Sequence, residues 1–225
     1  MEAMITTTNL SRSFPVAGSE PFYALRDVSI TVPKGQLTIL RGKSGSGKTT
    51  LINLLGALDE PSAGEIVLGG REYRNMNKTQ LEQLRRHHMG FVFQSVSLIP
   101  MMSVYENVEF ALRLSNYEGN FKTRVAECLD LVGLSNRVSH MPQELSGGEQ
   151  QRVAIARAIA HCPEVIFADE PTAELDSNTS RSVIKTFREL VESQGITIVM
   201  TTHDMSLMSE GDQIITLSDG QVLPE

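Results

Sequence analysis

Tryptophan is absent from this sequence and cysteine is rare, with Cys128 and Cys162 the two examples in 225 residues. Neither cysteine belongs to a C-x-x-C pair or stands near a histidine pattern, so we expect buried thiols in a reducing compartment rather than metal ligands or a disulfide. No apolar run approaches the roughly 20 residues that cross a bilayer. Residues 1–8 lack the basic and apolar regions of a signal peptide. The sequence predicts a cytoplasmic chain without a membrane span of its own.

Positive charge is also scarce, because the formal net charge is −7 at pH 7. This balance argues against a nucleic-acid-binding surface, so we expect no nucleic acid among the partners. A hydrophobic share of 40% and a charged share of 21% are typical of a soluble globular protein. The length suits one large domain with room for an insertion, and we expect a single domain over residues 1–225.

Residues 42–49 have the sequence GKSGSGKT, which fits the phosphate-binding pattern G-x-x-x-x-G-K-[ST]. The pattern predicts a short buried strand at 36–40 and a helix at 48–55. Backbone N–H groups at such a helix start favour an anion, Lys48 can reach the outer phosphates, and the Thr49 hydroxyl can ligate Mg²⁺. A glycine-rich turn without a ligand is the alternative, which this setting disfavours. The residues expected to bind the nucleotide are Gly42, Lys43, Ser44, Gly45, Ser46, Gly47, Lys48, Thr49 and Thr50.

Strand and helix patterns alternate along most of the chain, which favours an α/β fold with a mostly parallel central sheet. Between residues 95 and about 144 the patterns are helical, with Ser103 and Asn120 as predicted N-terminal caps. We therefore expect a helical insertion there. Further strands are predicted at 5–10, 24–32, 65–68, 90–93, 165–168 and 196–200, helices at 79–88, 146–162 and 180–193, and a hairpin at 214–221.

The predicted strand at 165–168 ends in two acids, Asp169 and Glu170. In P-loop enzymes an aspartate at this end of the sheet helps to hold Mg²⁺. A second acid that faces the γ-phosphate can polarise an attacking water. A strand that ends in Asp-Glu is weak evidence by itself, since acids often start turns. Beside a P-loop, the pair indicates that the site hydrolyses nucleotide as well as binding it.

Residues 145–152 read LSGGEQQR, and two interpretations fit them. Ser146 and Glu149 form a capping-box pattern, so Gly147 and Gly148 could be incidental. A capped helix start with two glycines also presents N–H groups and a hydroxyl to an anion. The segment closely resembles the LSGGQ signature of the ABC-transporter ATPase family, and several motifs follow in that family's order over essentially the whole chain.

This resemblance implies a P-loop NTPase fold with a RecA-like core, an N-terminal antiparallel β part and a helical subdomain inserted at about 95–144. It implies ATP and Mg²⁺ as cofactors. It also implies a head-to-tail homodimer, in which two ATP molecules lie between residues 42–49 of one subunit and Ser146, Gly147 and Gly148 of the other. ATP binding would shift the population toward the closed dimer, and hydrolysis would open it.

The resemblance also assigns roles around the two acids. Asp169 would hold Mg²⁺ together with Thr49 and Gln94. Glu170 would be the catalytic base, Gln94 would also contact the attacking water, and His203 would reach the γ-phosphate.

Further residues match weaker positions of the family. Asp176 closes the D-loop at 173–176 and would contribute to nucleotide binding. Phe14 falls where the family has an adenine-stacking aromatic side chain, and the nearby Tyr23 is the alternative. Lys43 stands where many relatives carry proline or arginine.

Residues 23–28, 90–94 and 98–108 resemble the branch that contains LolD, MacB and FtsE-like ATPases. That branch implies an ATPase subunit, peripheral on the inner face of the cell membrane, which drives an FtsX- or MacB-like transmembrane permease. The load would be a peptide, antibiotic or lipoprotein. One alternative is an FtsE-like regulator that transmits force and transports nothing. Another is a soluble P-loop kinase or DNA-repair ATPase, although a kinase needs neither the signature nor Glu170, and repair relatives generally carry long coiled-coil insertions.

Overall fold

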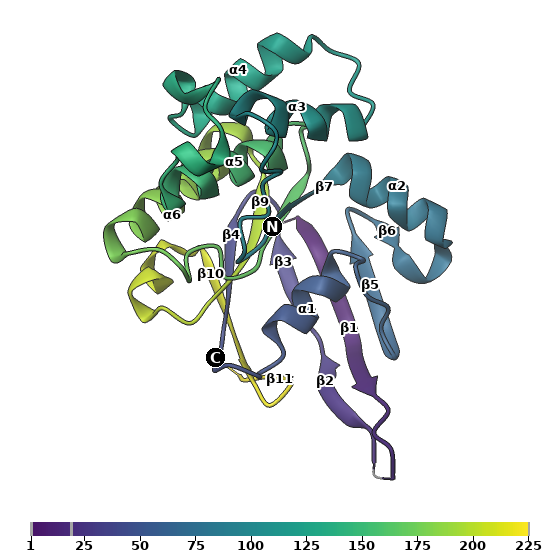
Figure 1. Ribbon diagram of the computed structural model, residues 1–225. Coiled ribbons are helices and arrows are strands. Elements are labelled where there is room, and N and C mark those ends of the chain that lie inside the picture. Colours follow the sequence, from purple (N-terminus) through teal and green to yellow (C-terminus); the bar gives the residue numbers. More distant parts are fainter. Residues whose placement is uncertain (1, 19, 225) are drawn as a thin grey trace.

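The computed structural model describes residues 2–18 and 20–224, which form two β-sheets with helices packed around them (Figure 1). In the central sheet, five neighbouring strands run parallel to one another: β10, β4, β9, β8 and β7. The short strand β11 pairs antiparallel with β10. The predicted mostly parallel sheet and C-terminal hairpin are therefore confirmed. Within the described part the sheet has six strands, in the order β11 (Gln221–Val222), β10 (Gln213–Ser218), β4 (Leu37–Arg41), β9 (Thr197–Thr202), β8 (Val165–Ala168) and β7 (Met89–Val92).

The second sheet is antiparallel and lies toward the N-terminus of the chain. β1 is its central strand, since it pairs with β2, β3 and β5. This sheet confirms the antiparallel β part that the family resemblance implies. Its strands are β1 (Ala3–Phe14), β2 (Phe22–Val28), β3 (Thr31–Pro33), β5 (Ala63–Leu68) and β6 (Arg71–Glu72).

The predicted strand at 24–32 is wrong in one respect, because the structure divides it into β2 and β3. The break falls at Ser29 and Ile30; just before it, inside β2, Asp27 has a φ of 49° at an irregularity in the pairing of β2 with β1. Thr7 of β1 bridges the interruption: its buried hydroxyl donates to the carbonyl of Val28 and accepts from the amide of Ile30. Both pieces therefore stay attached to β1.

Six helices longer than two turns occur in the described residues, and the two caps predicted in the helical region are present. Ser103 accepts a hydrogen bond from the amide of Glu106, and Asn120 accepts one from Thr123, so both predicted caps are confirmed. No strand lies in the described stretch 93–164. The helices are α1 (Lys48–Leu55), α2 (Lys78–His88), α3 (Val104–Leu114), α4 (Phe121–Leu131), α5 (Gly147–Ile159) and α6 (Ser177–Gln194). Shorter 3₁₀ turns are η1 (Tyr73–Asn75), η2 (Ser135–Arg137), η3 (Pro142–Glu144) and η4 (Met205–Glu210).

The central sheet separates two hydrophobic cores, because alternate residues of a strand point to opposite faces. Ile39 of β4 and Ile198 of β9 pack in the core that contains the apolar sides of α3 to α6. Their neighbours Leu40 and Val199 pack in the other core, with α1 and the antiparallel sheet. Figure 1 shows α3, α4 and α5 grouped at one end of the molecule and the β1–β2 hairpin at the other. All four of these side chains are fully buried, so the sheet is covered on both faces.

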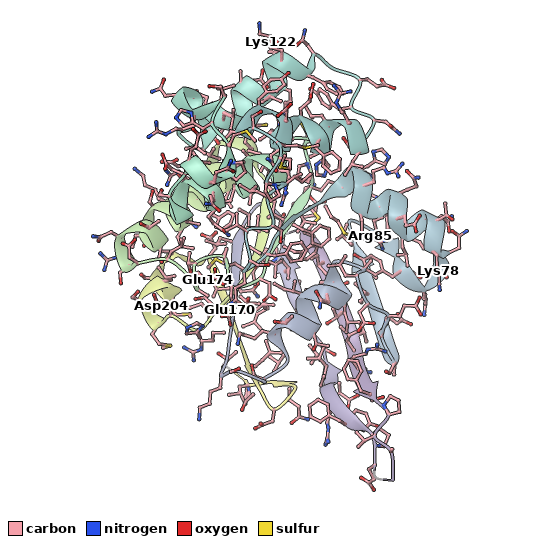
Figure 2. All side chains as sticks on the ribbon, in the orientation of Figure 1. Lys78, Arg85, Lys122, Glu170, Glu174 and Asp204 are labelled. Carbon is pink, nitrogen blue, oxygen red and sulfur yellow. The ribbon has the colours of Figure 1, made fainter. Side chains whose placement is uncertain are left out.

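The carboxyl ends of β4, β8 and β9 lie next to one another, as the parallel register requires. The P-loop follows β4, the acid pair follows β8, and His203 follows β9. Parallel strands place the loops after their carboxyl ends along one edge of the sheet, which is where such folds bind ligands. Figure 2 shows the side chains in the same view, with Glu170 and Asp204 near one another and Lys122 at the far end of the helical region.

Two further sequence expectations are tested by burial. Cys128 on α4 is buried as expected, but Cys162 is exposed, so that part of the expectation is wrong. Cys162 lies in the turn after α5 with a φ of 58°, where the chain leaves the core. Within residues 2–18 and 20–224, no helix combines the length and the apolar character that spanning a bilayer requires.

Candidate functional site

The P-loop leaves its lysine side chain folded over the loop's own carbonyl groups. Lys48 Nζ donates to the carbonyls of Gly42 at 2.9 Å and Lys43 at 3.2 Å, and the residue is 5% exposed. Gly47 has a φ of 101°, and a Cβ at this position would lie 2.6 Å from the carbonyl oxygen of Ala24. Glycine is therefore required at position 47 for both conformation and space. The result is a tight loop with a cation at its centre.

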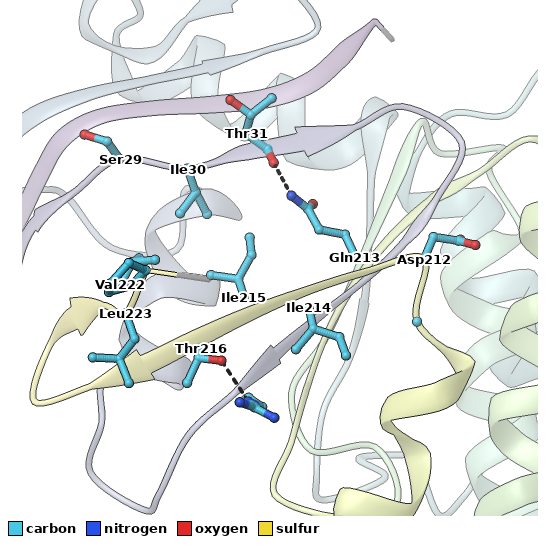
Figure 3. Close-up of a pocket in the computed structure, with 13 residues that line it drawn as sticks. Ser29, Ile30, Thr31, Asp212, Gln213, Ile214, Ile215, Thr216, Val222 and Leu223 are labelled. Carbon is cyan, nitrogen blue, oxygen red and sulfur yellow. Dashed lines mark hydrogen bonds between the residues drawn. The ribbon is translucent and has the colours of Figure 1, made fainter.

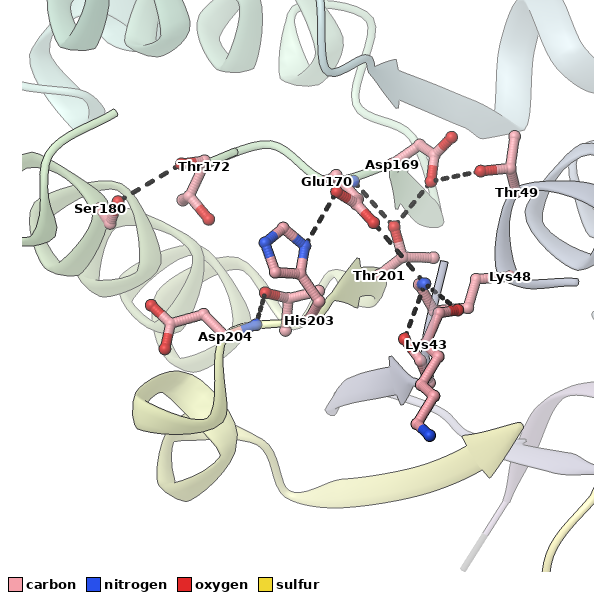
Figure 4. Close-up of polar contacts among 12 residues, drawn as sticks. Lys43, Lys48, Thr49, Asp169, Glu170, Thr172, Ser180, Thr201, His203 and Asp204 are labelled. Carbon is pink, nitrogen blue, oxygen red and sulfur yellow. Dashed lines mark hydrogen bonds and ion pairs between the residues drawn. The ribbon is translucent and has the colours of Figure 1, made fainter. Parts of the chain in front are cut away.

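The first acid of the pair is held by two hydroxyl groups. Asp169 Oδ1 accepts from Thr49 Oγ1 at 3.2 Å and from Thr201 Oγ1 at 2.6 Å. Thr201 also accepts the backbone N–H of Glu170 at 2.8 Å. Figure 4 shows this group, in which Thr201 of β9 contacts both acids and Asp169 also contacts Thr49 of the P-loop. Sequence reasoning missed Thr201, because its place depends on β9 lying beside β8.

The second acid, Glu170, lies between two cationic or protonatable groups. One carboxylate oxygen is 3.6 Å from Lys48 Nζ, and the other is 3.1 Å from Nδ1 of His203. Glu170 has a φ of 44°, a left-handed conformation that is uncommon for a residue with a side chain. Such strain is frequent at functional sites, where the surrounding structure holds the residue in place. The lysine, glutamate and histidine predicted from three distant motifs therefore meet in one network.

A cavity of about 340 Å³ opens beside this network and includes Glu170 and His203 in its lining. Gln94 lies at the same edge of the sheet, since it follows β7 by two residues and is exposed. The carbonyl of Val92, the last residue of β7, accepts the amide of Asp169 at 2.9 Å. The Gln94 segment therefore borders the acid pair.

A second cavity, of about 280 Å³, joins the P-loop to the β1–β2 hairpin. Phe14 lines it and Tyr23 does not, because the Tyr23 ring lies under the Arg26 guanidinium at 4.8 Å. Phe22, which sequence reasoning missed, also lines this cavity. Its other lining residues are Ala24, Ser44, Gly45, Gly47, Lys48, Thr49, Thr50 and Glu170.

The signature segment is organised around the start of α5. Ser146 Oγ accepts from the Glu149 amide at 3.3 Å, and the Glu149 carboxylate accepts the Ser146 amide at 2.9 Å, which confirms the capping box. Arg137 Nε also donates to Glu149 at 2.8 Å. Hydrogen bonds from Arg137, and then from Ser146, lower the pKa of the Glu149 carboxyl to about 2. Gly148 is needed for space, because a Cβ there would overlap Cγ2 of Thr179 on α6.

Two predicted nucleotide contacts lie apart from the P-loop within this chain. Ser146, Gly147 and Gly148 line neither of the two cavities described above. Asp176 caps α6, because its carboxylate accepts the amides of Asn178 at 3.0 Å and Thr179 at 3.2 Å. A hydrogen bond from the Thr179 hydroxyl, and after it those from the two amides, holds the pKa of Asp176 below its usual value.

A cavity of about 650 Å³ lies away from all of these residues, between the C-terminal hairpin and the segment that joins β2 to β3 (Figure 3). Ile215 and Val222 are among its lining residues. It contains none of the acids, glycines or histidines predicted from the motifs. We therefore assign no function to this cavity on the basis of its volume.

The model of the family described as ABC transporter matches residues 25–173. The chain belongs to this family. It is 43% identical over 221 residues to the macrolide export ATP-binding/permease protein MacB of Burkholderia pseudomallei, which covers 98% of the chain and 34% of that protein. The chain therefore spans about a third of the length of this relative. It is also 40% identical to an uncharacterized ABC transporter ATP-binding protein of Methanocaldococcus jannaschii, MJ0796, over 97% of the chain and 95% of the relative.

Solved structures of MJ0796 agree with this assignment. A dimeric structure of that ABC transporter cassette aligns with a TM-score of 0.88 and 39% identity, covering 98% of this chain and 97% of the other. A post-hydrolysis dimer bound to ADP and Pi aligns with a TM-score of 0.88 and 38% identity, again over 98% and 97%. These findings confirm the predicted fold class and the prediction of an ABC ATPase. They argue against a soluble P-loop kinase.

Proposed function

We propose that this ABC cassette binds Mg²⁺-ATP at its P-loop, hydrolyses it with Glu170 as the base, and drives a transmembrane permease of the FtsX or MacB type. The observation that carries the proposal is the single network of Lys48, Glu170 and His203 beside the hydroxyl-held Asp169. The name of the MacB relative, an ATP-binding/permease protein, supports the permease partner. The load is a peptide, an antibiotic or a lipoprotein, and its direction is export or extraction.

Three oxygen-bearing side chains are suited to Mg²⁺, which prefers carboxylate, hydroxyl and amide oxygens. Thr49 and Asp169 already converge, with 3.2 Å between Oγ1 and Oδ1, and Gln94 comes two residues after Val92, whose carbonyl accepts the Asp169 amide. Bound there, the ion would neutralise charge on the phosphate oxygens. Thr201 keeps the Asp169 carboxylate in place by donating to it at 2.6 Å.

Glu170 can act as a base once Lys48, its cationic partner, contacts a phosphate as well. In the described structure Lys48 Nζ contacts both the loop carbonyls and Glu170. A γ-phosphate would offer Lys48 a stronger anionic partner than the carboxylate at 3.6 Å. Glu170 would then accept a proton from the attacking water, while His203 at 3.1 Å orients the carboxylate and reaches the γ-phosphate.

The signature segment acts across a head-to-tail homodimer in this proposal. Ser146 and Gly147 are exposed, and they lie outside the cavities of their own P-loop and Glu170. Together with Gly148 they would contact the ATP bound by the second subunit. Asp176, at the end of the D-loop, would also contribute to binding this nucleotide. The dimeric cassette structures of MJ0796 support this arrangement.

The remaining expectations complete the proposal. The chain acts as a single domain over residues 1–225, and the helical region at about 95–144 contacts the permease. Residues 104–131 of that region form α3 and α4, which pack on α5 and so connect a docked partner to the signature. The subunit is cytoplasmic and peripheral on the inner face of the cell membrane, and nucleic acid is not a partner.

The decisive experiment compares the wild-type chain with Glu170→Gln. The substitution keeps the shape but removes the proton acceptor, so turnover should fall by about 100-fold or more. Mg²⁺-ATP binding should persist, and size-exclusion chromatography should show an ATP-dependent dimer. Undiminished phosphate release by the variant would contradict the role of Glu170.

An FtsE-like regulator that transmits force without transport is the second candidate, and it uses the same ATPase chemistry. Capture of tagged Glu170→Gln protein with Mg²⁺-ATP from detergent-solubilised membranes would separate the two. A MacB-like permease among the captured proteins supports export. An FtsX-like protein among them supports force transmission.

A further inference from the structure

We propose that Phe22 is a second base-contacting residue of the nucleotide site, and that Arg12, held by Asp59, positions the Phe14 ring. The inference rests on the proposed function, because it concerns the nucleotide bound at the same P-loop. It assigns three residues that neither the motifs nor the comparisons single out. The site would take a purine ring against the surface formed by the two phenylalanine side chains.

Phe22 is exposed in a way that packing within the chain does not explain. The side chain is 59% exposed, and Phe14 on the facing strand is 39% exposed. The two residues are direct partners in the antiparallel register of β1 and β2, so their side chains lie on the same face of the hairpin. Both line the cavity that contains Lys48 and Thr49. Two exposed phenylalanines on one face, beside a phosphate-binding loop, form a surface that a flat aromatic ligand would cover.

The strand alternation and the P-loop contact decide which aromatic residues face the site. Ala24, two residues after Phe22, lines the same cavity, and its carbonyl packs against Gly47 of the P-loop. Residues two apart on a strand share a face. Phe22 is therefore directed over the P-loop, while Tyr23 stacks with Arg26 instead.

Arg12 packs on one face of the Phe14 ring and so fixes the orientation of that ring. Its guanidinium lies over the ring, with Cζ 4.6 Å from the centroid. The same guanidinium makes two hydrogen bonds to Asp59, each 2.8 Å long, through Nε and one terminal nitrogen. A two-pronged pair of this kind restricts the guanidinium plane. One face of Phe14 is thus covered by a fixed cation, and the ring is held ready for a base on the cavity side.

Base stacking can be separated from phosphate binding by comparing two ligands. Mg²⁺-ADP and inorganic pyrophosphate with Mg²⁺ share the diphosphate, and only ADP carries the adenine. We would measure both dissociation constants by titration calorimetry on the full chain. Phe22→Ala should weaken ADP binding by about tenfold and leave pyrophosphate binding unchanged, since stacking on one aromatic ring is lost. Phe22→Tyr should retain ADP affinity, because it keeps the ring.

Tyr23→Ala is the matched control, because it removes the neighbouring aromatic ring from outside the cavity. It should change neither dissociation constant. If Phe22→Ala leaves ADP binding unchanged, or weakens ADP and pyrophosphate equally, Phe22 is not a base contact and the inference fails. If the wild-type chain binds neither ligand, the proposed nucleotide function itself fails, which is a different result.

The role of Arg12 is tested by a double-mutant cycle. Arg12→Gln should weaken ADP binding by about threefold, as expected for a loss of one cation–π contact, without affecting pyrophosphate. In a Phe14→Ala background the same substitution should have no further effect, because Arg12 acts through that ring. An equal effect of Arg12→Gln with and without Phe14, or an effect on pyrophosphate, would overturn the positioning role.

Discussion

Helix α1 follows a glycine-rich loop and helix α5 begins with two glycines, but their first turns are arranged differently. The N-cap of α1 is Gly47 in a left-handed conformation, without a side-chain capping bond and without an acid in the first turn. The N-cap of α5 is Ser146, with Glu149 of the first turn completing a capping box. The backbone N–H groups in the first turn of α1 therefore remain available for an anion in the P-loop cavity. In α5, the capping box already satisfies part of the first-turn N–H groups.

The comparison extends to the reason for each glycine. At position 47 a side chain would meet the carbonyl oxygen of Ala24 on β2, a residue that lines the cavity beside the P-loop. At position 148 it would meet a methyl group of Thr179 on α6. The first constraint belongs to the phosphate site, and the second to helix packing within the chain. The glycines of the signature are therefore not explained by ligand binding alone.

The largest effect should come from Gly47→Ala. The new Cβ meets a backbone carbonyl, and the left-handed φ of 101° is unfavourable for alanine, so we expect a loss of about 3 kcal/mol in the free energy of unfolding together with loss of ATP binding. Gly195→Ala is the control, because its φ of 66° is also left-handed but no atom lies within 4 Å. Urea unfolding and ATP titration would check both; equal losses in the two variants would mean that backbone conformation, not the contact with β2, decides.

A smaller effect should come from Gly148→Ala, which we expect to destabilise the fold by about 2 kcal/mol through overpacking against Thr179. Thr179→Ser removes the offending methyl group and keeps the hydroxyl that binds Asp176, so it should restore most of the loss. Gly147→Ala should be nearly neutral, since its Cβ would lie 3.4 Å from Leu175 Cδ2. Thermal unfolding of Gly148→Ala, of the double variant Gly148→Ala/Thr179→Ser and of Gly147→Ala gives the measurement. Failure of the Thr179→Ser rescue would show that the glycine is needed for another reason.

The smallest effect should be the pH dependence of the α5 cap. Arg137 and Ser146 lower the folded-state pKa of Glu149 from 4.5 to about 2, so the unfolded state binds the proton more tightly. The contribution of Glu149 to stability is therefore complete above pH 4.5 and is lost as the pH falls toward 2. Glu149→Gln should flatten the acid side of the stability curve, measured by urea unfolding between pH 5 and pH 2. An unchanged slope would contradict the role of the carboxylate.

The features that sequence predicted well are those set by neighbours along the chain. The capping residues Ser103, Asn120 and Ser146 act on amides three residues away, and their hydrogen bonds are present in the structure. The P-loop pattern likewise spans eight consecutive positions between β4 and α1. Local patterns of this kind do not depend on how distant segments pack.

Sequence alone predicted the parallel sheet and the local caps, because these follow from short-range spacing and periodicity, and the resemblance of its motifs indicated the family. Tertiary structure decided which distant side chains meet. It placed Thr201 against Asp169, brought Phe22 rather than Tyr23 to the P-loop cavity, and set Thr179 against Gly148. Each of these contacts joins residues on different elements, and its geometry depends on strand register and helix packing that no single stretch of sequence encodes.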